Sequence, residues 1–331
     1  MSTGPDETFA FPGLDRKVPP LGVGTWAWGD EKTWGMGGYD PALTEATIAE
    51  AWRASIDAGV ALIDTAEVYG KGESERIIGR LLAATPADRS RAVLASKFMP
   101  SPNKLDVVSA MRSAALASRD RLGVDVIDLY QIHGPISLRS KAALAEALAT
   151  VHAEGIVAAV GVSNYSIKEM TSIHGELAKR NLALASNQIE FSPLRTSPET
   201  SGLLSRCAAL GVVVLAYSPL GQGRLGGRYS AKNPPPSSRN FSAHPMERVD
   251  RIVDVLRSIG EEHGGRTPAQ VALRWIIDKG AVPIPGAKNA MQATGNAGAL
   301  GWTLTEVDIA AIDAVSLSGV RSLANRFWQH G

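Results

Sequence analysis

The stretch VIDLYQIHGPISLRSKAALAEALATVHAEGIVAAVGVSN, residues 126–164, contains the pattern that decides the fold. Two short runs, residues 126–133 and 157–164, are almost continuously apolar and rich in β-branched residues. Between them, residues 140–153 are rich in Ala and Leu and carry polar residues at helical spacing. Apolar runs without alternation are typical of strands buried on both faces of a parallel sheet. The stretch therefore predicts a strand, a covering helix and a second, parallel strand.

The same unit recurs along the chain. Eight candidate strands lie at residues 21–26, 61–67, 92–98, 126–133, 157–164, 185–191, 212–220 and 281–287. Helices are expected at residues 44–57, 73–83, 105–121, 140–153, 167–179 and 199–209, with a final helix at 305–314. The strands begin 27 to 40 residues apart, except that the last begins 69 residues after the seventh. This near-constant period indicates a repeated strand–helix unit.

Eight such units without a dividing linker favour a closed (β/α)8 barrel, a TIM barrel, as a single domain over residues 1–331, rather than an open doubly wound sheet. A hairpin at residues 9–20 is expected to cover the barrel floor. The long last interval is interpreted as holding an insertion, residues 221–240. Its stretches GQGRLGG and KNPPPSSRN are too rich in Gly, Pro and Ser to predict regular structure.

Composition excludes several classes of partner. The 34 basic and 33 acidic residues leave no excess of positive charge to bind nucleic acid or an anionic membrane. A single cysteine, Cys207, permits no intrachain disulfide, and we find no targeting segment at the N-terminus. These features predict a cytoplasmic protein. The sequence leaves the oligomeric state open and is compatible with a monomer.

Ionisable residues occur in or at the ends of three predicted strands. Asp64, Lys97 and His133 lie there, and Tyr69 follows the second strand. Strand ends in a barrel share one rim, and catalytic groups come from the carboxyl-terminal rim. We therefore expect these four residues to form a catalytic site. A purely structural ion pair between Asp64 and Lys97 is the alternative.

The motifs that contain these residues resemble those of aldo-keto reductases. They are IDTAEVYG (63–70), ASKF (95–98), LYQIHGP (129–135), GVSNYS (161–166), SNQIEFSPL (186–194), AYSPLGQGRL (216–225) and IPGAKN (284–289). All occur in the order of the family, from about residue 21 to residue 302. AEVYG, AYSPLGQG, PIPGAKN and GALGW are similar to members from plant plastids and cyanobacteria.

The resemblance implies an alcohol:NADP+ oxidoreductase that reduces aldehydes or ketones with NADPH. Tyr69 would donate the proton that neutralises the developing oxyanion. Lys97 would favour the tyrosinate, and Asp64 would keep Lys97 charged and in place. His133 would orient the carbonyl oxygen. Because a glutamate replaces this histidine in members of the family that reduce C=C bonds, His133 indicates carbonyl chemistry.

The resemblance also implies the cofactor site. Ser163, Asn164 and Gln188 would bind the nicotinamide carboxamide, Tyr217 would stack on its ring, and the insertion at 221–240 would lie over the pyrophosphate. Lys288 would pair with the adenosine 2′-phosphate, which NADH lacks. The family usually has an acidic residue where Gly295 stands, so cofactor affinity is expected to be lower. The other implied contacts are Gly24, Thr25, Trp26, Ser218, Pro219, Leu220, Gln222, Gly223, Arg224, Pro285, Gly286, Ala287, Gln292 and Asn296.

An apolar substrate pocket is expected beside these groups. The loop after the first strand, residues 26–40, contains Trp26, Trp28 and Trp34, and its position on the rim suits an aldehyde with a hydrophobic body. Phe98 is a further candidate, and Phe327 and Trp328 are weaker ones. The histidines outside the motifs have no spacing that indicates a metal site, and none is expected.

Two other functions remain compatible with the sequence. One is an NADPH-binding redox-sensing or regulatory protein with weak turnover, which would bind NADPH without appreciable oxidation of it. The other is a lyase or aldolase that uses Lys97 to form a Schiff base. Borohydride trapping would distinguish the aldolase from the reductase.

Overall fold

A barrel of parallel strands forms the centre of the computed structural model, which describes residues 7–29, 42–237, 243–320 and 328–331. The strands are β3 (Gly22–Gly24), β4 (Leu62–Asp64), β5 (Val93–Phe98), β6 (Ile127–Ile132), β7 (Val157–Ser163), β8 (Leu184–Glu190), β9 (Val213–Tyr217) and β10 (Val282–Pro283), paired in chain order. A parallel bridge between Gly24 and Gly286, with Gly24 N donating to Pro285 O at 3.0 Å, joins the first strand to the last. The predicted (β/α)8 architecture is therefore confirmed.

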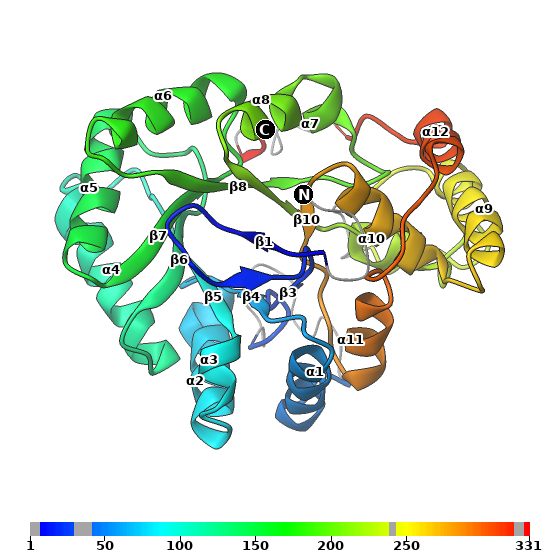
Figure 1. Cartoon of the computed structure of the whole chain (residues 1–331), viewed down its shortest axis with the longest axis horizontal. Helices are drawn as coiled ribbons and strands as arrows, with labels where there is room; N and C mark the ends of the chain where they lie inside the picture. The colour runs from blue at the N-terminus through cyan, green and yellow to red at the C-terminus, as the bar shows by residue number, and fades with distance from the viewer. Residues whose placement is uncertain (1–6, 30–41, 238–242, 321–327) are drawn as a thin grey trace.

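Helices surround this sheet (Figure 1). They are α1 (Glu45–Asp57), α2 (Glu73–Ala84), α3 (Asp88–Arg91), α4 (Val107–Leu122), α5 (Lys141–Ala153), α6 (Ile167–Ala178), α7 (Ser197–Thr200), α8 (Leu203–Ala209), α9 (Met246–Glu262), α10 (Pro268–Asp278), α11 (Ala290–Ala297) and α12 (Glu306–Val315). Capping boxes at Thr44, Ser166, Thr267 and Thr305 define where four of them begin. Within the described ranges, no helix combines the length and apolar character needed to cross a membrane.

The N-terminal hairpin covers the amino-terminal end of the barrel. Its strands β1 (Phe9–Ala10) and β2 (Lys17–Val18) pair antiparallel, as predicted, and lie across the strand ends (Figure 1). Between them and the barrel, the guanidinium of Arg16 donates to Ala92 O at the start of β5 and lies 3.7 Å from the carboxylate of Asp128. This leaves the opposite, carboxyl-terminal end for the functional groups.

Two sequence expectations need correction. The helix expected at 199–209 is interrupted at Gly202, whose φ of 83° separates α7 from α8. The interval between the last two barrel strands is also more regular than expected, because it contains the helices α9 and α10. Its GQGRLGG stretch forms a short 3-10 segment, η3 (Gly221–Gly226), in which Gln222 and Gly223 adopt left-handed conformations. The glycine-rich stretch therefore forms a turn of defined geometry that its composition did not predict.

Candidate active site

Three adjacent strands bring the ionisable residues together at the carboxyl-terminal rim. Asp64 is the last residue of β4, Lys97 lies near the end of β5, and His133 directly follows β6. Their exposed fractions are 2%, 0% and 8%, so all three are buried. Unpaired ionisable groups are costly to bury, and their meeting at one place indicates a built site.

Lys97 is the centre of this cluster. Its Nζ donates to Asp64 Oδ2 at 2.5 Å and to Thr65 O at 2.8 Å, and it lies 3.4 Å from Tyr69 Oη. Burial lowers the pKa of Lys97, whereas the Asp64 carboxylate opposes that shift. The carboxylate thus favours the charged form of Lys97 next to the phenol.

Asp64 is itself held by two amides. Gln188 Nε2 donates to Asp64 Oδ1 at 2.8 Å, and Gln131 Nε2 lies 3.4 Å from the same oxygen. Ser186 in turn donates to Gln131 Oε1 at 3.2 Å. Sequence reasoning missed Gln131, although its position two residues before His133 places both side chains on the same face of β6. These bonds fix the orientation of the carboxylate.

Tyr69 lies at the start of the 3-10 segment η2 (Tyr69–Gly72). Burial raises the pKa of its phenol well above 10, and the charge of Asp64 raises it further. From the sequence, Lys97 was expected to lower the pKa of the Tyr69 phenol and so favour the tyrosinate. Burial, with the Asp64 charge added to it, therefore favours the protonated phenol, which is the form that a proton donor requires.

The turn after Tyr69 is sterically locked. Gly70, Lys71 and Gly72 have φ angles of 57°, 54° and 85°, three left-handed residues in succession. A Cβ added at Gly70 would lie 2.1 Å from the carbonyl oxygen of Gly29, in the loop that follows β3. Only glycine fits there. The position of the phenol is thus fixed by contact between two rim loops.

His133 lies on the other side of the phenol. The Tyr69 and His133 ring centroids are 5.6 Å apart, at an interplanar angle of 74°. Burial and the charge of Lys97 both lower the pKa of the imidazole well below 6.5, so it is neutral at physiological pH. Among the described residues, its buried Nδ1 has no hydrogen-bond partner. Such an imidazole retains hydrogen-bonding capacity for a ligand.

The residues expected around a nicotinamide carboxamide also converge. Tyr217 Oη lies 3.0 Å from Asn164 Oδ1, and Asn164 Nδ2 donates to Ser163 Oγ at 3.2 Å. Ser163 Oγ donates to Gln188 O at 3.0 Å, at the end of the next strand. Asn164 has a φ of 62°, a left-handed conformation that turns the chain at the end of β7. Gln188 Nε2 donates one of its two hydrogens to Asp64, which leaves its second N–H and its Oε1 for a ligand.

After β9, the chain turns repeatedly. Ser218, Gly221, Gln222 and Gly223 all have positive φ, between 49° and 92°. Gly221, Gln222 and Gly223 are left-handed in succession, and the two glycines lack side chains that would keep a ligand away from the backbone. Pro219 and Leu220 lie within this segment, and Arg224 Nη1 donates to Gly221 O at 3.1 Å.

After β10, the chain leads into helix α11. Asn289 caps the helix by accepting from Gln292 N at 3.0 Å, and Gln292 Oε1 accepts from Lys288 N at 3.0 Å. Asn296 Nδ2 donates to Gly286 O at 3.3 Å. Lys288 is therefore half-buried beside a helix N-terminus, where anions are favoured. Gly295 lies on the same helix, with open space around its Cα.

This geometry agrees with a comparison of the whole sequence. Residues 20–317 match the model of the "Aldo/keto reductase family". The chain belongs to the aldo/keto reductase family. It is 34% identical over 325 residues to a chloroplastic pyridoxal reductase of Arabidopsis thaliana, and this match spans 94% of the chain and 87% of the relative.

Solved structures are similar to this aldo/keto reductase over nearly its whole length. A glycerol dehydrogenase from Gluconobacter oxydans superposes with a TM-score of 0.80 at 29% identity, covering 96% of this chain and 98% of that one. A Klebsiella pneumoniae aldo/keto reductase, solved in complex with NADP and acetate, has a TM-score of 0.70 at 28% identity, with coverages of 95% and 96%. The family and its barrel make this chain an oxidoreductase.

The aromatic residues expected to line the substrate pocket of this aldo/keto reductase differ in how far they are buried. Trp26 is half-buried on the rim, whereas Trp28 is 1% exposed and donates from Nε1 to Ala287 O at 2.8 Å. Phe98 is fully buried, with Lys104 Nζ 4.1 Å from its ring centroid. Trp34 and Phe327 lie outside the described residues. Trp328 is half-buried, and its ring centroid lies 5.5 Å from that of His133.

Two expected cofactor contacts stabilise the rim itself. Gly24 donates to Pro285 O, and the Thr25 hydroxyl donates to Asp64 O at 2.9 Å. Over the ranges that the structure covers, no cluster of three or more His, Cys, Asp or Glu side chains could hold a metal ion.

Proposed function

We propose that this aldo/keto reductase uses NADPH to reduce aldehydes and ketones to alcohols, with Tyr69 as general acid. The observation that carries the proposal is the convergence of the Tyr69 phenol, the Asp64–Lys97 pair and the neutral His133 at one rim. The NADP bound to the Klebsiella relative supports the cofactor.

The residues present fit NADPH. Ser163, Asn164 and Gln188 offer amide and hydroxyl groups to a carboxamide, next to the half-exposed ring of Tyr217. The left-handed turns of η3 suit a pyrophosphate, and Lys288 at the start of α11 suits a 2′-phosphate. When bound, the cofactor would supply the hydride.

The side chains would then manage the charge that develops on the substrate. His133 would hydrogen-bond the carbonyl oxygen and hold it beside Tyr69 Oη. As the oxygen becomes negative, Tyr69 would transfer its proton to it, which completes the alcohol. The resulting phenolate would be stabilised by the Lys97 ammonium until water returns a proton. Asp64 would keep that ammonium in place.

The direct test is NADPH oxidation by the purified protein against a panel of carbonyl compounds, with NADH in parallel. Because of the named Arabidopsis relative, pyridoxal belongs in this panel beside aliphatic and aromatic aldehydes and simple ketones. Turnover with NADPH is expected. Tight NADPH binding without turnover of any compound would instead support the redox-sensing or regulatory alternative.

Replacement of Lys288 by alanine tests the cofactor assignment. Loss of a charged partner for the 2′-phosphate is expected to weaken NADPH binding by roughly 10- to 100-fold and NADH binding by less than about twofold. Dissociation constants from fluorescence titration measure both. Equal losses for the two cofactors would reject Lys288 as the 2′-phosphate residue.

The pH dependence should differ between the two reaction directions. With the pKa of His133 well below 6.5 and that of Tyr69 well above 10, neither group titrates near neutrality. Carbonyl reduction should therefore be nearly independent of pH from about pH 7 to pH 9, whereas alcohol oxidation, which needs the phenolate, should rise with pH. Rate profiles in both directions check this. A sharp fall in reduction across that range would contradict the assignment.

A further inference from the structure

The strap, which we define as residues 328–331, lies across the carboxyl-terminal ends of β6 to β9. The Trp328 ring packs against His133, and a Cβ added at Gly134 would lie 2.9 Å from that ring. The backbone N–H of His330 donates to Asn164 O at 3.2 Å, and Arg195 Nη2 donates to Gly331 O at 2.7 Å. This short segment thus touches the neighbourhood of both the imidazole and the carboxamide-binding residues.

Within the strap, Gln329 contacts the expected nicotinamide platform. Its Nε2 lies 3.1 Å from Tyr217 Oη and also donates to the carboxylate of Glu190. The two hydrogens of one amide nitrogen can serve these two acceptors. Since Tyr217 Oη can donate onward to Asn164 Oδ1, the phenol is held from two sides.

The bond from Gln329 to Glu190 fixes the Gln329 side chain. Glu190 ends β8 and is 3% exposed, so its carboxylate is removed from bulk water. A buried carboxylate that accepts a hydrogen bond forms a stronger link than a neutral oxygen does. Gln329 is therefore fixed to the rigid barrel on one side while it contacts the Tyr217 hydroxyl on the other.

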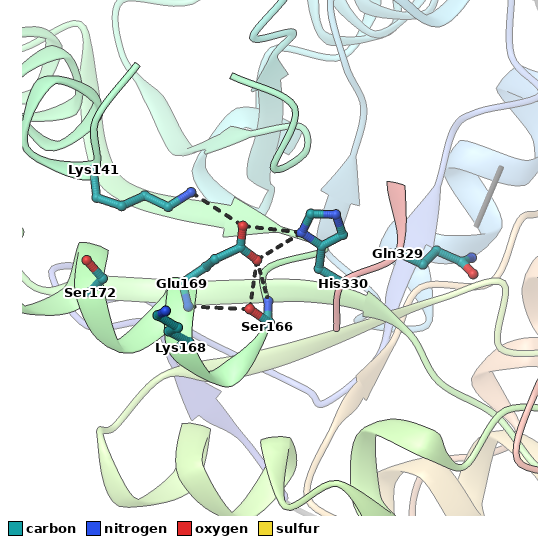
Figure 2. A pocket seen from close by; sticks show the side chains of 7 residues that line it. All are labelled: Lys141, Ser166, Lys168, Glu169, Ser172, Gln329 and His330. Carbon is teal, nitrogen blue, oxygen red and sulfur yellow. Dashed lines mark hydrogen bonds and ion pairs between the residues drawn. The ribbon is translucent and has the colours of Figure 1, made fainter. Parts of the chain in front are cut away.

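The strap has separate outer anchors. His330 Nδ1 lies 3.1 Å from the carboxylate of Glu169. Lys141 and the cap residue Ser166 contact the same carboxylate (Figure 2). In the same view, Gln329 points away from this group. The strap should therefore stay in place when only the Gln329 side chain is changed.

We propose that Gln329 is a positioning residue for hydride transfer, which holds the Tyr217 ring through its hydroxyl and thereby sets the depth and angle of the nicotinamide. This inference rests on the proposed function. Small displacements of a reacting group reduce the rate more than the affinity, because the transition state demands closer alignment than binding does. Gln329 would act through Tyr217 and would not itself touch the substrate or the reacting atoms.

A double-mutant cycle tests this role. Gln329→Leu, which removes the amide at similar size, should lower kcat about tenfold while raising the carbonyl KM less than about twofold. Tyr217→Phe, which keeps the ring and removes the hydroxyl, should cause a similar loss. If Gln329 acts through that hydroxyl, Gln329→Leu should change kcat less than about twofold in the Tyr217→Phe background.

His330→Ala is the matched control, because it removes only the side-chain contact with Glu169, while the bonds from His330 N to Asn164 O and from Arg195 to Gly331 O still hold the strap. It should retain kcat within about twofold, and melting curves of all variants should verify folding. Multiplicative losses in the cycle, or an equal loss in His330→Ala, would overturn the proposal. If the wild-type protein binds NADPH but reduces nothing, the proposed function fails. The cycle is then followed by the fluorescence spectrum of bound NADPH, which reports the surroundings of the nicotinamide, and independent effects of the two substitutions on that spectrum would reject the positioning role.

Discussion

Replacement of Tyr69 by phenylalanine is expected to lower kcat for carbonyl reduction by about 10²- to 10⁴-fold, the usual contribution of a general acid. The substitution removes only the hydroxyl, which lies 3.4 Å from Lys97 Nζ. The ring should stay, because the left-handed turn that follows it depends on contact with Gly29 and not on the hydroxyl. Steady-state kinetics with NADPH and the best aldehyde of the panel measure the loss.

NADPH binding provides the control for this variant. The Tyr69 hydroxyl has no part in the proposed contacts with the pyrophosphate or the 2′-phosphate, so the dissociation constant should stay within about twofold of wild type. Lys288→Ala should show the opposite pattern, with weakened binding and a smaller effect on kcat. Retained turnover in Tyr69→Phe would mean that another group supplies the proton.

Replacement of Lys97 by methionine should affect activity and stability together. It leaves the Asp64 carboxylate 2% exposed and without its cation, and breaking a buried ion pair from one side costs about 3–5 kcal/mol of unfolding free energy. Reduction should fall to near background, because the phenolate formed during the reaction loses its stabilising charge. Denaturant unfolding and single-turnover assays measure the two effects.

The double variant Asp64→Asn with Lys97→Met separates these effects. Removing the stranded negative charge should restore most of the stability, since Gln188 and Gln131 can remain near a neutral amide. Activity should not return, because no cation is present beside Tyr69. Recovery of both properties would show that the pair is purely structural, which was the alternative interpretation of the sequence.

The sequence was sufficient to predict the barrel because its buried strands are continuous apolar runs at a nearly constant period. It was also sufficient to predict the meeting of Asp64, Lys97 and His133, since the ends of parallel strands share one rim. Helices α9 and α10 were not predicted, although both lie in the long last interval beyond the insertion assigned to residues 221–240. The break at Gly202 was missed because helix propensity on both sides concealed one left-handed residue.

Other features of the site depend on tertiary contacts that no local pattern reports. The pKa of Tyr69 rises because the phenol is buried and lies near the Asp64 charge, and both depend on the folded structure. The residues after α12 read as a polar tail, and only the folded chain brings Gln329 to the Tyr217 hydroxyl. Glu190 lay within a matched motif, but its burial beside Arg195 could not be inferred from that motif.

The close approach of Gly70 to the Gly29 carbonyl limits which substitutions could give this protein new substrates. Since a Cβ at Gly70 would clash with the Gly29 carbonyl oxygen, a change of shape in the loop after β3 is expected to shift Tyr69, the proposed proton donor. Few substitutions in the loop after β3 should therefore change substrate selectivity without also moving Tyr69. The strap packs on the imidazole through Trp328 and is not among the neighbours of Gly70. Directed evolution of substrate range should accordingly begin with libraries at Trp328, where diversity can be explored without moving the acid.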